Sequence, residues 1–116
     1  MKDPPSEFYD RFDIVVLPFP FTDRSTMKRR PALILSNPDY QKSSGHLICA
    51  MVTTAARSKW PGDTTIAAWV DAGLPKPSKV RLKLFTLDAR FVIRRLGKLV
   101  ESDASEVTEA LSKTLN

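Results

Sequence analysis

Hydrophobic residues in this chain come in short runs that are separated by prolines and polar turns. Six such runs are candidate strands: residues 12–19, 32–36, 47–53, 64–70, 80–85 and 92–99. Short runs that are rich in β-branched residues and bounded by turn residues are typical of strands rather than helices. The run at 80–85 alternates apolar and basic residues, which predicts a half-buried strand with one cationic face.

The spacing of the apolar residues changes near the end of the chain. There they recur three or four positions apart, as on one face of a helix: Ala104, Val107, Ala110, Leu111 and Leu115. Ser102 or Asp103 can cap this helix, and Asp103 with Glu106 has the spacing of a capping box. The pattern therefore predicts a mainly β protein, a small barrel of about six or seven short antiparallel strands, closed by an α-helix over residues 103–115.

Length and composition fit one soluble domain. The chain has 116 residues, enough to bury about two-thirds of its unfolded surface, so we expect a single domain over 1–116 with residues 1–11 as an N-terminal leader. One cysteine, Cys49, excludes an internal disulfide, and one histidine, His46, excludes the usual structural zinc sites. No apolar run approaches the roughly 18 residues of a membrane span, and the first ten residues lack a secretory signal. We therefore expect a cytoplasmic protein.

Basic residues are concentrated in the middle of the chain. The formal net charge is +5, but residues 24–98 hold fifteen basic and four acidic residues, a net charge of +11. Such a basic body favours a polyanionic partner such as nucleic acid. The loop before strand 32–36 ends in Lys28, Arg29 and Arg30. By composition it is an ordinary solvated loop, but Arg30 and Pro31 lead directly into the strand, which anchors the Arg30 guanidinium.

Six sequence blocks, in this order, resemble the MazF/PemK-like toxins, the mRNA interferases of type II toxin–antitoxin systems. The blocks are residues 13–19, 28–36, 52–54, 78–81, 84–88 and 95–99. The resemblance extends from about residue 12 to the C-terminal helix. At one position the chain departs from the family, which usually has glycine before the aspartate of the first strand, where this chain has Phe12.

The resemblance implies an SH3-like barrel, a homodimer, and an endoribonuclease that cleaves single-stranded mRNA without a metal or other cofactor. It also implies neutralisation by an acidic antitoxin protein. The family's catalytic arginine falls on Arg30, and its catalytic threonine or serine falls on Thr53.

Other basic, hydroxyl and aromatic residues are candidates for binding RNA. They are Arg24, Lys28, Arg29, Thr54, Arg57, Lys59, Trp60 and Arg81. Basic side chains can contact phosphates, and the Trp60 ring can stack on a base, although it can equally well pack on the rim of the barrel. Arg81 is included because a basic residue is common near this position in the family.

The chemistry of RNA cleavage suits an arginine and a threonine. The 2′-hydroxyl of RNA can attack the adjacent phosphorus, which leaves a 2′,3′-cyclic phosphate. Arg30 can stabilise the charge on the phosphate oxygens through its planar fork, and Thr53 can hydrogen-bond the phosphate or the nucleophile. No residue is an obvious general base: His46 is expected more than about 20 Å from Thr53, at the other end of its strand, and Cys49 is expected in the core.

Two other functions fit parts of this sequence. The same barrel serves toxins that poison DNA gyrase by binding it, and a small basic barrel can also bind RNA without cleaving it. A gyrase poison has no need of the matches at Arg30 and Thr53, so the sequence favours the nuclease. The acidic residues show no Asp-x-Asp or Glu-x-x-His spacing, which argues against a metal-dependent nuclease.

Overall fold

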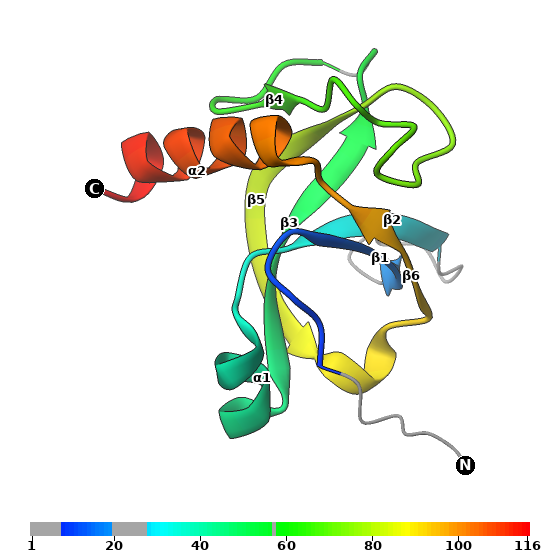
Figure 1. Ribbon diagram of the computed structural model, residues 1–116, viewed down its shortest axis with the longest axis vertical. Helices are drawn as coiled ribbons and strands as arrows, with labels where there is room; N and C mark the ends of the chain where they lie inside the picture. Colours follow the sequence, from blue (N-terminus) through cyan, green and yellow to red (C-terminus); the bar gives the residue numbers. More distant parts are fainter. Residues whose placement is uncertain (1–7, 20–27, 57) are drawn as a thin grey trace.

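Six antiparallel strands form a sheet that curls into a half-barrel, and a C-terminal helix packs beside it (Figure 1). The computed structural model describes residues 8–19, 28–56 and 58–116. The sheet order is β4-β5-β3-β2-β1-β6. The strands are β1 Asp13–Phe19, β2 Lys28–Ile34, β3 His46–Thr54, β4 Thr64–Thr65, β5 Ser78–Asp88 and β6 Arg94–Lys98. The helices are α1 Pro38–Ser44, the 3₁₀ turn η1 Ala89–Phe91, and α2 Glu101–Leu115. The predicted fold class is confirmed.

Strand β2 begins four residues before the predicted strand 32–36. Arg30 pairs with Leu17 of β1, and Arg29 pairs with Pro18, so the basic end of the loop belongs to the sheet. Strand β5 is also longer than the predicted strand 80–85, because its two ends pair along the whole of β3. The remaining predicted strands, apart from 64–70, agree with β1, β3 and β6 to within two residues.

The short helix α1 was not predicted from the sequence, where no helix was expected between the strands at 32–36 and 47–53. The Asn37 side chain accepts a hydrogen bond from the Tyr40 amide at 2.9 Å, and Pro38 occupies the first helical turn. Gly45 ends the helix in the left-handed conformation. These are ordinary signals for the start and the end of a helix. The helix was not predicted because the segment is too short to show a helical spacing of apolar residues.

Asp103 does not cap the last helix, and that prediction is wrong. Helix α2 begins at Glu101, and its N-cap residue, Val100, makes no side-chain hydrogen bond. The buried Asp103 carboxylate instead accepts hydrogen bonds from the amides of Ala67 and Ala68, at 3.1 and 2.9 Å. These contacts hold residues 67–73 in turns, so the predicted strand 64–70 shrinks to the two residues of β4.

The core has two parts, one on each face of the curled sheet. One part lies between the sheet and α2 and includes Ile14, Leu33, Val80 and Val107. The other lies on the opposite face: Val15, Leu17, Ala32, Ile34, Leu47 and Cys49. Burial raises the pKa of the Cys49 thiol to about 12, so the thiol stays protonated and acts as a small core group. No helix in the described part of the chain is long and apolar enough to cross a bilayer.

Phe12 stands where the family usually has glycine, and its backbone is left-handed. Its φ is 75°, and no other non-glycine residue in the described ranges has a positive φ. Backbone hydrogen bonds hold this conformation: the Phe12 amide donates to the Ile34 carbonyl at 2.6 Å, and the Phe12 carbonyl accepts from the Leu99 amide at 3.1 Å. A side chain in this region costs about 1–2 kcal/mol, which glycine avoids.

We therefore expect Phe12→Gly to be more stable than Phe12→Ala by about 1 kcal/mol. Both variants lose the same half-buried ring, and they differ only in how well they tolerate the left-handed backbone. Urea unfolding of the two variants measures the difference. An alanine variant as stable as the glycine variant would show that the backbone at residue 12 is not strained.

Candidate active site at the open end of strands β2, β3 and β5

Arg30 and Thr53 lie at matching ends of neighbouring strands. The β2–β3 ladder runs from Ile34 paired with Cys49 to Ala32 paired with Met51. Arg30 and Thr53 each lie two residues beyond that last pair, still within their strands. Because side chains alternate along a strand, Arg30 is on the face of Ala32, and Thr53 is on the corresponding face of β3. The fold therefore brings the two predicted catalytic residues to one end and one face of the sheet.

Strand β5 adds two cations to this face. Lys79 pairs directly with Thr53, and Arg81 pairs with Met51. Val80, between them, points into the core beside α2, so Lys79 and Arg81 point to the opposite face. Lys79 was not among the residues predicted from the sequence, although the alternation of basic residues along this strand was a signal for it.

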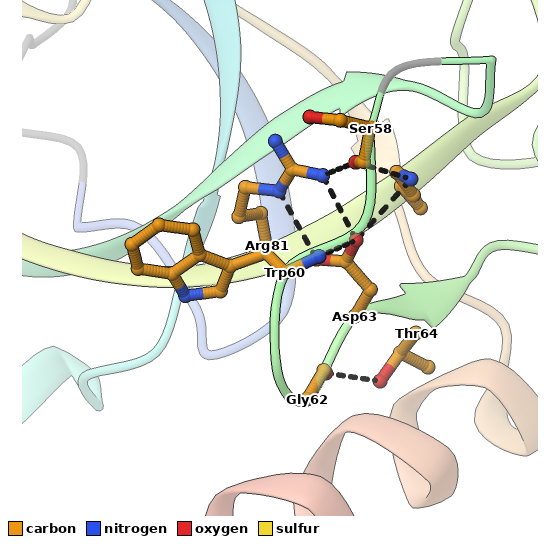
Figure 2. A network of polar contacts seen from close by, with 7 residues as sticks. Ser58, Trp60, Gly62, Asp63, Thr64 and Arg81 are labelled. Carbon is orange, nitrogen blue, oxygen red and sulfur yellow. Dashed lines mark hydrogen bonds and ion pairs between the residues drawn. The ribbon is translucent and has the colours of Figure 1, made fainter.

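Asp63 binds both cations (Figure 2). The Arg81 Nε donates to Asp63 Oδ1 at 3.1 Å, and Arg81 Nη2 donates to Oδ2 at 2.9 Å. The Lys79 Nζ lies 3.2 Å from Oδ2. The Ser58 carbonyl accepts from Lys79 Nζ at 3.1 Å and also from Arg81 Nη2. The side chains of Lys79 and Arg81 are only 9% exposed, and that of Asp63 is 14% exposed.

The charges of this cluster do not balance. Burial acts to raise the pKa of Asp63, but hydrogen bonds from Arg81, Lys79 and the Trp60 amide outweigh it and leave the pKa below its ordinary value. The hydrogen bond with Asp63 in turn raises the pKa of Arg81. These three side chains, Lys79, Arg81 and Asp63, carry two positive charges and one negative charge next to Thr53.

An open cleft of about 410 Å³ borders Arg30 on the opposite face of β2, beside Pro31 and Leu96. Arg29, Arg30 and Pro31 of β2 line one side, and Arg94 and Leu96 of β6 line the other. Arginines on both sides and apolar side chains between them suit an extended polyanion with apolar groups, such as a single-stranded nucleic acid.

The chain matches the family of PemK-like, MazF-like toxins of type II toxin–antitoxin systems over residues 10–115. It belongs to this family. The predicted family is thereby confirmed. No match was found among curated proteins.

Solved structures of MazF proteins have the same fold. MazF from Deinococcus radiodurans is 27% identical, with a TM-score of 0.72 over 94% of this chain and 97% of that one. The MazE–MazF structure from the same organism gives 26% identity and a TM-score of 0.74, with the same coverage. An endoribonuclease in complex with its cognate antitoxin from a mycobacterial species is 18% identical, with a TM-score of 0.72 over 92% of both chains, and it supports the fold alone.

The other predicted RNA contacts of this MazF-like chain are spread around the site. Lys28 and Arg29 are exposed on β2, Lys59 is exposed, and Thr54 is half-buried at the end of β3. Trp60 is 41% exposed, and the Lys83 Nζ lies 4.3 Å from the centre of its ring. Arg24 and Arg57 fall outside the described residues. Their roles in binding RNA remain predictions.

His46 lies at the opposite end of β3 from Thr53 and pairs with Asp88 of β5. At about 3.3 Å per residue, the two are more than about 20 Å apart within one chain. His46 Nδ1 is 3.0 Å from the Ser44 carbonyl oxygen. Within the described ranges, no three histidine, cysteine or acidic side chains come together as a metal site would require.

Proposed function

We propose that this chain is a toxin that cleaves single-stranded mRNA in the cytoplasm, as one domain that uses its own side chains and no metal. The observation that supports this most is the placement of Arg30 and Thr53 at one end and face of the sheet, with Lys79 paired to Thr53. Membership of the MazF-like toxin family supports the same function.

The proposed step is attack of the RNA 2′-oxygen on the adjacent phosphorus. The bond from phosphorus to the 5′-oxygen breaks, which gives a 2′,3′-cyclic phosphate and a 5′-hydroxyl. The proton of the 2′-hydroxyl is removed, and the leaving 5′-oxygen gains one. Arg30 stabilises the charge on the non-bridging oxygens, an effect of about 3–4 kcal/mol for a well-placed donor. Thr53 hydrogen-bonds the phosphate or the nucleophilic hydroxyl.

An acidic antitoxin and a second copy of the chain are the proposed protein partners. Membership of a family of toxins from type II toxin–antitoxin systems, together with the MazE–MazF structure from Deinococcus radiodurans, supports an antitoxin partner. The arginines of the cleft, Arg29, Arg30 and Arg94, give an acidic segment a complementary surface. An antitoxin bound there competes directly with RNA.

The test is to incubate the purified protein with a long single-stranded RNA in excess EDTA. We expect discrete fragments that end in a 2′,3′-cyclic phosphate, and no cleavage of the same sequence as a duplex. Intact RNA would contradict the proposal. RNA that is bound but not cut would support a binding module, and DNA breaks that depend on gyrase would support the gyrase poison.

A further inference from the structure

We propose that Asp63 is a positioning residue for the cleavage reaction: its carboxylate holds the Arg81 guanidinium and the Lys79 ammonium in place beside Thr53. This inference rests on the proposed function, because it assigns Arg81 and Lys79 to the charge that surrounds the reacting phosphate.

Asp63 holds the Arg81 guanidinium in one orientation in addition to pairing with its charge. Both carboxylate oxygens accept from the guanidinium, one from Nε and one from Nη2, which sets the plane of the group. The carboxylate is itself held by a tight turn. The Trp60 amide donates to Asp63 Oδ2, and the Asp63 amide donates to the Trp60 carbonyl, both at 3.0 Å.

The position of the cluster connects it to the reaction. Lys79 is the direct cross-strand partner of Thr53, and Arg81 is two residues further along on the same face. Both cationic side chains are about nine-tenths covered, so their charges are only weakly screened by water. Two cations and one carboxylate leave a net positive charge, which stabilises negative charge developing on a phosphate at Thr53 without any rearrangement of the side chains.

Removing a carboxylate next to a phosphate site can have two opposite effects. One changes the binding of RNA and the other changes the rate of the chemical step, so KM and kcat distinguish them. By charge alone, removal of Asp63 makes the site more positive, so RNA binds more tightly. By positioning, removal takes away the carboxylate that orients Arg81 and Lys79, so the chemical step slows. We expect Asp63→Asn to lower kcat at least about tenfold while KM stays unchanged or falls, because small misplacements of catalytic groups cost this much or more. Asp63→Glu should recover part of kcat.

Asp103→Asn is the matched control. Asp103 is a buried carboxylate that likewise holds the segment after residue 58, through the amides of Ala67 and Ala68, and its hydrogen bonds are to those amides rather than to Lys79 or Arg81. At temperatures where all variants are folded by circular dichroism, Asp103→Asn should keep the wild-type kcat. If Asp63→Asn does not fold, Arg81→Lys serves instead: it keeps the charge and loses the fork, and it should lower kcat at unchanged KM.

A measurement without RNA separates this proposal from the proposed function. In nitrogen-15 NMR spectra, the Arg81 Nε–H signal should exchange slowly with water in the wild type and rapidly in Asp63→Asn. A protein that cleaves no RNA but shows this change overturns the function and leaves the positioning of Arg81 intact. An unchanged or increased kcat in Asp63→Asn, an equal loss in Asp103→Asn, or an unchanged Arg81 signal overturns the positioning role.

Discussion

Arg30→Ala is expected to lower the single-turnover rate of RNA cleavage by at least about 100-fold, because it removes the group that stabilises charge on the phosphate. Arg30→Lys keeps the positive charge but loses the planar fork, so its rate should lie between those of the wild type and Arg30→Ala. Thr53→Ala should also slow cleavage, by removing the hydroxyl that orients the phosphate or the nucleophile. Rates at saturating enzyme, measured on one labelled RNA, report the chemical step rather than binding.

Arg90→Ala is the matched control for the change in charge. The Arg90 side chain is 89% exposed and pairs with Asp88, at the end of β5 far from Thr53. The variant loses the same charge as Arg30→Ala, so it should weaken general attraction to RNA equally and leave the rate at saturation near wild type. Equal losses in Arg30→Ala and Arg90→Ala would show that net charge, not placement at the site, accounts for the effect.

Gly97→Ala is expected to destabilise the protein by about 3 kcal/mol or more, the upper range for a side chain forced into packed structure. A Cβ at residue 97 would lie 2.4 Å from the Ala72 carbonyl oxygen, and a Cβ at residue 73 would lie 2.2 Å from the Leu96 carbonyl oxygen. The turn around Gly73 and strand β6 therefore pass each other in backbone contact. Strand β6 cannot move away from this turn without breaking its pairing with β1.

Gly45→Ala measures the cost of a left-handed alanine without a steric contact, whereas Gly97 has no positive φ and its substitution tests the contact alone. Gly45 has a positive φ of 74°, but no heavy atom lies within 4 Å of a Cβ placed there. This variant should lose only about 1 kcal/mol, the cost of a left-handed alanine. Urea unfolding of both variants gives the comparison, and a Gly97→Ala variant no less stable than Gly45→Ala would contradict the backbone contact.

The predictions from sequence succeeded where the signal is local. Strands β1 and β3 follow from continuous apolar runs bounded by turns, and the helical spacing at the C-terminus follows from residues three and four apart. Short blocks of neighbouring residues also pointed to Arg30 and Thr53, whose catalytic roles stay predictions. Each of these signals lies within a few residues, so no knowledge of distant contacts was needed.

The predictions failed where a distant group decides the local structure. Asp103 has the sequence spacing of a helix cap. Its carboxylate instead accepts hydrogen bonds from two backbone amides more than thirty residues away in the sequence. These contacts end the strand predicted over residues 64–70. The pair of Asp63 and Arg81 is hidden for the same reason, since the two residues belong to different elements.

The amino-acid pattern alone was sufficient for the fold class and for the family, and it led to the proposal of Arg30 and Thr53 as catalytic residues, because periodicity and short motifs depend on neighbours in the chain. The surroundings of those residues depended on the folded protein. The pairing of Lys79 with Thr53, the binding of two buried cations by one carboxylate, and the backbone contact at Gly97 all join segments that are far apart in sequence. Such contacts are set by strand register and burial, which exist only once the sheet has formed.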